Sequence, residues 1–354
     1  MPVSRRYPRL VLLIGALAAM LLGSTTVPAA AEDVENRVAF TFTDRKITES
    51  SGLVVRGPLA FTINDSGDGP RLYSVDTATG DTVATTTYSS DVVEDVEALA
   101  PGQGADVWVG DIGDNAEERD SLNVYRVVPL GGARQQRNAV EGDRKAIEET
   151  VEAEKFSLVY PDSAHDAETL LVHPDTGRLH VVTKSVTGGT VYAAPDTLDP
   201  ESANRLQEVV DVPGLVTDGS FLPDGDHILL RSYGRAAIYT FPELRLVGPL
   251  DLPAQKQGEG VAVDRDGSVF LSSEGIFSDV LAIVLPDEVI EALGNPKLDK
   301  TLPAKPPPKP EIPASEPVST GGDAVLWVVV GIVGVALAGW LAIAVARRRS
   351  RRRW

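Results

Sequence analysis

Glu49-Ser-Ser-Gly-Leu53 is the first of five related phrases in this chain, and their recurrence is its strongest structural signal. The other four are Asp95-Val-Glu-Ala-Leu99, Asp166-Ala-Glu-Thr-Leu170, Thr217-Asp-Gly-Ser-Phe221 and Gln257-Gly-Glu-Gly-Val261. Each phrase precedes a short apolar run that ends on polar residues, and a third run, often carrying tyrosine, follows. Copies spaced roughly 40 to 70 residues apart, with three or four short strands in each, predict an all-β protein with the β-propeller fold.

The spacing of the phrases predicts five or six blades. Five repeats are legible, and the long interval between the second and third leaves open a sixth, degenerate blade. Within that interval, the charged, Glu-rich stretch from Asn138 to Lys155 predicts an exposed helical or disordered insertion. A propeller closes when one end of the chain completes the blade formed by the other, so Asn36 to Thr43 is predicted to supply the outer strand of the last blade.

The sequences at both ends of the chain predict the cellular location of the propeller. Arginines, a short apolar stretch and Ala29-Ala30-Ala31 indicate a cleaved signal peptide over residues 1–31, with an uncleaved anchor as the alternative. The propeller is assigned to 32–295, a proline-rich linker to 296–323, a transmembrane helix to 324–346 and a basic cytoplasmic tail to 347–354. Because arginines mark the cytoplasmic side, we expect a single-pass type I protein of the cell membrane with an extracellular propeller.

Composition excludes several classes of function. The chain has 51 acidic against 33 basic residues, a net charge of −18 and no cysteine. Nucleic acid is disfavoured as a partner because phosphate binding needs a basic face. Without cysteine there are no disulfides, thiolate nucleophiles or cysteine-ligated metals. The chain also has no Gly-x-Ser-x-Gly elbow, phosphate-binding loop or dinucleotide fingerprint.

The repeat predicts a site at one end of the propeller. The start of each first strand and the end of each second strand emerge on the same face, so polar residues at both positions converge there. The first set is Glu49, Asp95, Glu97, Asp166, Glu168, Asp218 and Glu259, and the second is Asn64, Asp65, Asp111, Asp114, Lys184, Arg231 and Glu274. Crowded carboxylates favour protonation or a bound cation, and hard oxygen donors favour calcium, or less strongly magnesium.

Two other roles remain open for these residues. Acidic groups at the start of inner strands can accept backbone N–H bonds from a neighbouring blade and hold the blades together, or they can contact a ligand directly. His165, beside Asp166 and Glu168, is the one histidine placed for acid–base chemistry, and its alternative role is that of a solvated loop residue.

The chain resembles secreted actinobacterial propellers of the TolB-like and phytase-like group. The resemblance covers about residues 36 to 290 and is carried by the stretches Glu49–Leu53, Asn64–Gly67, Asp95–Leu99, Trp108–Asn115, His165–Glu168 and Val182–Lys184. The resemblance to phytases implies calcium ligands at Glu97, Asp111, Asp114, Glu168 and Glu259, and phosphate contacts at Lys184, Arg231 and Arg235.

Two functions follow as expectations. The first is a membrane-tethered binding or scaffold propeller whose acidic, calcium-binding channel mouth captures a cell-wall component, a peptide or a protein. The alternative is a calcium-dependent phosphoester hydrolase. Binding is favoured because so acidic a domain repels anionic esters unless metal reverses the local field.

Overall fold

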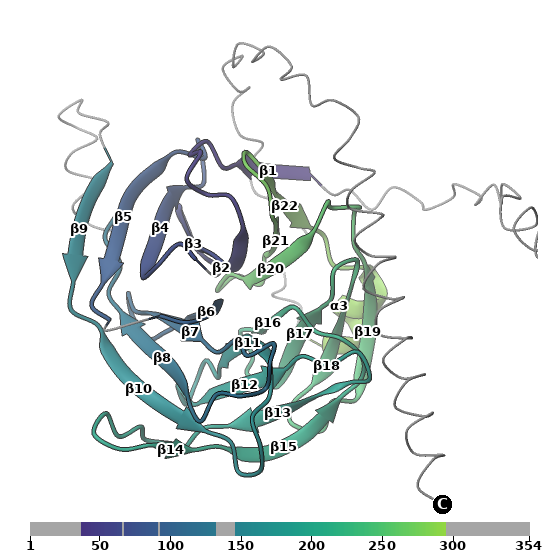
Figure 1. The fold of residues 1–354 in the computed structure, drawn as a ribbon. Helices are drawn as coiled ribbons and strands as arrows, with labels where there is room; N and C mark the ends of the chain where they lie inside the picture. Colours follow the sequence, from purple (N-terminus) through teal and green to yellow (C-terminus); the bar gives the residue numbers. More distant parts are fainter. Residues whose placement is uncertain (1–36, 66, 91–92, 132–145, 295–354) are drawn as a thin grey trace, which may run out of the picture. The chain divides into compact units, whose positions relative to one another are not determined.

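The described part of the chain folds into five mainly antiparallel sheets set around one axis, as blades (Figure 1). The computed structural model describes residues 37–65, 67–90, 93–131 and 146–294. Blade 1 contains β2 (Ser50–Arg56), β3 (Leu59–Asn64), β4 (Arg71–Asp76), β5 (Thr82–Tyr88) and β9 (Ile147–Val151). Blade 2 contains β6 (Val96–Pro101), β7 (Val107–Asp111), β8 (Leu122–Val127), β10 (Glu154–Val159) and β14 (Asn204–Arg205).

The other three blades have four strands each. Blade 3 contains β11 (Ala167–Val172), β12 (Leu179–Thr183), β13 (Gly189–Ala193) and β15 (Gln207–Val212). Blade 4 contains β16 (Asp218–Phe221), β17 (His227–Arg231), β18 (Arg235–Thr240) and β19 (Leu246–Asp251). Blade 5 contains β20 (Gly258–Val263), β21 (Val269–Ser273), β22 (Asp279–Ile283) and β1 (Arg37–Thr41).

The five inner strands form a closed ring. Contacts run from β2 to β6, β11, β16 and β20, and β20 returns to β2 (Figure 1). Each inner strand lies in one of the five repeats, so the predicted β-propeller is confirmed. In the described part of the chain the blade count is five, and the long interval contains no sixth blade.

The ring closes as predicted, with a strand from the N-terminal side of the first repeat. Strand β1 pairs antiparallel with β22 and so completes blade 5. Phe40 and Phe42 on this segment are buried, and their rings meet edge to face with centroids 5.7 Å apart. Closure therefore combines backbone pairing with burial of two aromatic side chains.

The prediction of a helical or disordered insertion is wrong over residues 147–155. Ile147–Val151 form β9, which pairs in parallel with β5, the outer strand of blade 1. The segment that begins at Glu154 is β10, the fourth strand of blade 2. The outer edge of β5 offers unpaired backbone groups, and pairing there leaves Glu148 and Glu149 exposed to water. A Glu-rich composition is compatible with an edge strand of this kind.

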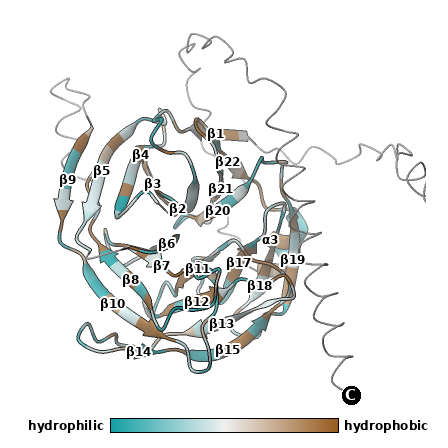
Figure 2. Cartoon of the chain, in the orientation of Figure 1, coloured by the Kyte–Doolittle hydropathy of each residue, from teal (hydrophilic) through white to brown (hydrophobic). Residues whose placement is uncertain are grey.

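Apolar packing between blades holds the propeller together. Five clusters of buried apolar side chains occur, one between each pair of neighbouring blades. Helix α3 (Asp287–Leu293) adds Val289 and Leu293 to the cluster between blades 4 and 5. The outer strands are more polar, as the hydrophilic stretches on β10 and β15 show in Figure 2.

The predicted signal peptide, the membrane span at 324–346, the basic tail and the whole of the predicted linker lie outside the described residues. Among the residues that are described, no helix is long and apolar enough to cross a membrane.

We predict that Phe40→Ala destabilises the whole propeller, because β1 closes the ring. Removing this buried ring should lower the free energy of unfolding by about 3 to 5 kcal/mol in urea titrations. Val38 lies on the same strand and is 39% exposed, so Val38→Ala should cost no more than about 0.5 kcal/mol. Equal losses for the two variants would show that closure does not depend on the buried face of β1.

Candidate metal centre at the channel mouth

A change of strand register occurs at the same place in four of the five repeats. In blade 2, Val96 lies opposite Asp111 but Ala98 lies opposite Gly110, so Glu97 is an extra residue. The same shift falls at Glu168 in blade 3, and blades 1 and 5 shift within Ser50–Leu53 and Gly258–Val261. Such bulges re-aim a side chain. These bulges lie at one end of the central channel, where the inner strands begin and the second strands end. This end of the channel is the channel mouth.

Three carboxylates meet at the channel mouth. Asp65 follows β3, Asp95 precedes β6 and Glu97 lies in β6, so the group joins blades 1 and 2. One carboxylate oxygen from each side chain lies within 4.8 Å of the other two. Glu97 is 6% exposed and also accepts a hydrogen bond of 3.2 Å from the Ser51 hydroxyl. The three acids, the carboxylate cluster, have the spacing and donor type of a hard-cation site.

The electrostatics of the carboxylate cluster are unfavourable without a cation. Burial raises the pKa of Glu97 to about 9, and the neighbouring Asp65 and Asp95 carboxylates add to this shift. Burial, Asp65 and Asp166 also raise the pKa of Asp95. At neutral pH Glu97 therefore holds a proton unless a cation replaces it, and cation binding would release that proton.

The loop from Asp111 to Asn115 packs directly against the carboxylate cluster. A Cβ atom added to Gly113 would lie 2.4 Å from Asp95 Oδ2 and 2.9 Å from Glu97 Cγ. A side chain there would have to displace Asp95, so glycine permits the close approach of this backbone. Gly113 N also donates to Asp95 O at 3.1 Å, which fixes the loop to the start of β6.

Asp111 and Asp114, predicted as calcium ligands, hold this loop. Asp111 Oδ1 accepts hydrogen bonds from Asp95 N and from Arg119 Nη1, both at 3.0 Å. Asp114 accepts from the backbone N–H groups of Glu118 and Arg119, and Arg119 Nη1 also donates to Gly113 O at 2.8 Å. The sequence did not indicate a role at this site for Arg119, whose side chain is 9% exposed. It follows the loop by a few residues, and no repeat position marks it.

Lys184 lies among glutamates from three blades. Its ammonium donates to Glu168 Oε1, and its charge opposes the raised pKa values of Glu97 and Glu259. Burial raises the pKa of Glu259 to about 7, with Glu274 contributing in the same direction. Lys184 thus interacts with each of Glu97, Glu168 and Glu259.

Arg231 joins blade 4 to blade 5. Its side chain is buried, and Nη1 donates to Gly260 O at 2.7 Å and to Ser272 O at 3.2 Å. Arg235, predicted beside it as a ligand contact, is exposed at the start of β18. Asp218 is also buried, and its Oδ2 accepts from Val261 N at 2.7 Å. The Asp218 bond is of the kind expected if acidic residues at the start of inner strands hold neighbouring blades together, which was one of the roles left open above.

Asp166 makes the same type of bond between blades 2 and 3, since its Oδ1 accepts from Asp114 N at 2.8 Å. His165 stands next to it but faces an aromatic group. Its ring stacks on Tyr192 and meets Tyr160 edge to face, and Nε2 lies 3.0 Å from Asp162 Oδ2. His165 is therefore placed outside the carboxylate cluster.

Comparisons with known proteins add little to this picture. No family model matches the chain, and no curated protein matches it. A solved structure that is similar is glutaminyl cyclase from Myxococcus xanthus, with a TM-score of 0.43 and 13% identity over 71% of this chain and 97% of that chain. Nothing about activity is carried over at this level of similarity. The resemblance to TolB-like and phytase-like propellers stays a prediction.

We predict that Glu97 makes the metal-free protein less stable as pH rises. Between the ordinary pKa of 4.5 and the folded-state value of about 9, the folded protein holds a proton that the unfolded chain has released. The free energy of unfolding should therefore fall across this range, by up to about 1.4 kcal/mol per pH unit. Glu97→Gln should remove this component of the slope in urea titrations performed with chelator.

Glu49→Gln is the matched control, because Glu49 is an exposed acid that lies just before the first bulge. This variant should keep the wild-type dependence on pH. A Glu97→Gln protein with an unchanged slope would show that Glu97 ionises normally in the folded state.

Proposed function

We propose that this protein is a binding propeller that holds a calcium ion at Asp65, Asp95 and Glu97 and captures its partner at the channel mouth. The observation that carries the proposal is the carboxylate cluster, in which one oxygen from each acid lies within 4.8 Å of the others. The bulge at Glu97 and the close approach of Gly113 support it, since both bring the three acids together at an electrostatic cost.

The donor set fits calcium better than other common metals. Three carboxylates are hard oxygen ligands, and the cluster includes neither histidine nor thiol. Magnesium keeps several waters and demands near-octahedral geometry, whereas calcium accepts irregular carboxylate sets. Asp65, Asp95 and Glu97 would hold the ion. When bound, calcium would supply positive charge to an acidic surface and attract carboxylate, phosphate or carbonyl oxygens of a partner.

The surroundings of the cationic side chains at the channel mouth favour binding over phosphoester hydrolysis. A hydrolase needs cationic side chains that are available to grip the ester. Lys184 is paired with Glu168, and the Arg231 guanidinium is buried against backbone carbonyls of blade 5. Of the three predicted phosphate contacts only Arg235 is exposed, so two of the three are not presented to a substrate phosphate.

The proposal also includes the cellular location of the propeller and the class of partner that it binds. A signal peptide over 1–31 and a membrane span over 324–346 would place the propeller outside the cell on a proline-rich tether. A cell-wall component, a peptide or another surface protein is the partner class that such a position offers.

We predict saturable calcium binding to the chelator-treated full-length protein. Calcium should raise the melting temperature, because a ligand that binds only the folded state stabilises it. Isothermal titration should show affinity lowered by about tenfold or more in Asp95→Asn and Glu97→Gln. Gly113→Ala should act similarly by displacing Asp95, whereas Gly234→Ala, at a position with open space, should leave affinity unchanged. A melting temperature indifferent to both chelator and calcium would refute the calcium site.

Turnover separates the two candidate functions. We expect no calcium-dependent hydrolysis when the purified protein is incubated with p-nitrophenyl phosphate, phytate or glycerophosphate. We also expect Asp95→Asn and Glu97→Gln to reduce capture of cell-wall or membrane components that the wild-type protein retains in calcium. Calcium-dependent turnover that both variants abolish would replace the binding function with hydrolysis.

A further inference from the structure

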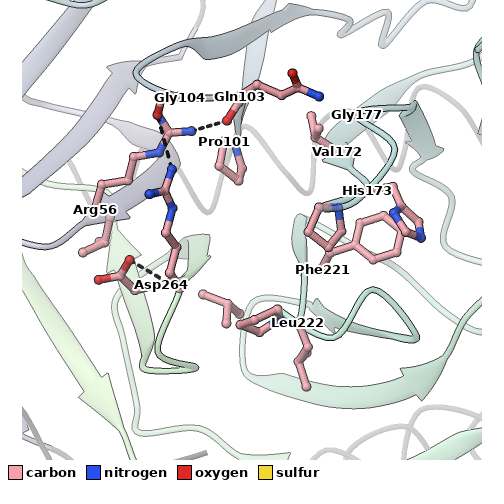
Figure 3. A pocket seen from close by; sticks show the side chains of 16 residues that line it. Arg56, Pro101, Gln103, Gly104, Val172, His173, Gly177, Phe221, Leu222 and Asp264 are labelled. Carbon is pink, nitrogen blue, oxygen red and sulfur yellow. Dashed lines mark hydrogen bonds between the residues drawn. The ribbon is translucent and has the colours of Figure 1, made fainter.

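A second concave site lies at the opposite end of the channel from the carboxylate cluster. It has a volume of about 430 Å³ and is lined by the first hairpin of every blade. Figure 3 shows its two sides, with Arg56 and Asp264 on one and Val172, His173 and Phe221 on the other. The volume suits a small molecule, since ligand pockets commonly occupy about 300 to 1,000 Å³.

Two arginines from neighbouring blades converge on one side of this pocket. Arg56 ends β2 in blade 1, and Arg265 lies in the first turn of blade 5. Arg56 Nη1 donates to Gly104 O at 3.0 Å, and Arg265 Nη2 reaches the same carbonyl at 3.3 Å. Arg56 Nη2 also donates to Gly102 O. The backbone of the blade 2 hairpin therefore holds two guanidinium groups together.

This arginine pair carries positive charge that its surroundings balance only in part. A guanidinium has five N–H donors, and the bonds above use two on Arg56 and one on Arg265. Burial and the Arg265 charge lower the pKa of Arg56, while Asp106 and Asp264 oppose that shift. Asp264 is itself engaged, because it accepts from Gly57 N at 3.1 Å and from Arg265 N at 2.7 Å. An incoming anion would relieve the repulsion between the arginines.

The other side of the pocket is apolar and aromatic. Phe221 ends the first strand of blade 4, the buried Leu222 follows it, and Val172 ends the first strand of blade 3. The His173 ring lies against Phe221 with centroids 5.0 Å apart, and its Nδ1 faces the backbone N–H groups of Asp175 and Thr176. This wall offers a surface for an apolar ring or chain.

We propose that this pocket binds a small organic anion in which a carboxylate is joined to an apolar ring or chain. Arg56 and Arg265 would bind the carboxylate, since guanidinium groups match its two oxygens in a paired geometry. Phe221, Leu222 and Val172 would cover the apolar part. The pocket lining carries two arginines against one aspartate, although the whole chain has a net charge of −18. An anion is therefore attracted to this end of the propeller, although the net negative charge of the protein repels anions elsewhere.

The proposal does not depend on the calcium site. Between the two ends, the inner strands enclose a cavity of about 10 Å³, lined mainly by apolar residues such as Leu53, Leu99 and Val261. A space of this size holds at most about one water molecule, and none of the three acids of the carboxylate cluster lines the pocket.

Binding of phenylacetate to the full-length protein tests the proposal. Saturation-transfer NMR and isothermal titration should detect phenylacetate at millimolar concentration. Phenylacetamide, which lacks the charge, and acetate, which lacks the ring, should each bind about tenfold more weakly or worse, because a charge-assisted bond or an apolar contact is lost. Calcium or chelator should not alter these affinities, which separates this outcome from failure of the proposed function.

Arg265→Gln is the decisive variant, because the side chain is exposed and its loss should leave the fold intact. It should weaken phenylacetate binding by about tenfold or more, and Arg56→Gln should do the same if its melting curve stays cooperative. Arg245→Gln is the matched control, since Arg245 is 74% exposed in another turn outside the pocket. Absence of phenylacetate binding, or equal affinity in Arg265→Gln and wild type, would overturn the proposal.

Discussion

Close packing of five inner strands around a narrow axis is the constraint on which this structure depends. A Cβ atom on Gly52 would lie 2.6 Å from Leu99 N of the neighbouring blade, and one on Gly260 would lie 3.2 Å from Leu53 N of the next. The fourth position of the repeated phrase therefore takes small residues. The third position bulges in blades 2 and 3, and the strand register also shifts within the phrase in blades 1 and 5. This packing explains why the phrase recurs in each repeat, because a larger residue at the fourth position would push neighbouring blades apart.

The same packing crowds acids at the channel mouth, and the protein resolves that crowding in two ways. Asp218 and Asp166 accept backbone N–H bonds from adjacent blades, which compensates their burial. Glu168 pairs with Lys184. Glu97 accepts a hydrogen bond from the Ser51 hydroxyl, and burial raises its pKa to about 9. The unresolved repulsion is therefore concentrated between blades 1 and 2, where a cation gives the largest gain.

The sequence predicted the propeller, its closing strand and the face on which acids converge, because each follows from strand alternation and repeat geometry. It did not predict β9, because a Glu-rich edge strand and a solvated insertion share one composition. It also did not separate Asp65 and Asp95 from Asp111 and Asp114. That distinction depends on the bulge at Glu97 and on Arg119, which binds Asp111. Arg56 and Arg265 stand in hairpins whose residues indicate only turns, so the pocket had no signature in the sequence.

The two ends of the channel differ in charge but are built on the same strands. Strand β2 carries Ser51, which bonds to Glu97 at the mouth, and ends at Arg56 in the pocket. Strand β6 carries Glu97 and leads into the hairpin whose Gly104 carbonyl holds both arginines. The backbone and packing of β2 and β6 therefore provide a direct path by which one end can influence the other. Because these strands belong to one closed ring, a ligand at either end stabilises the same folded unit, even when neither ligand changes the affinity of the other.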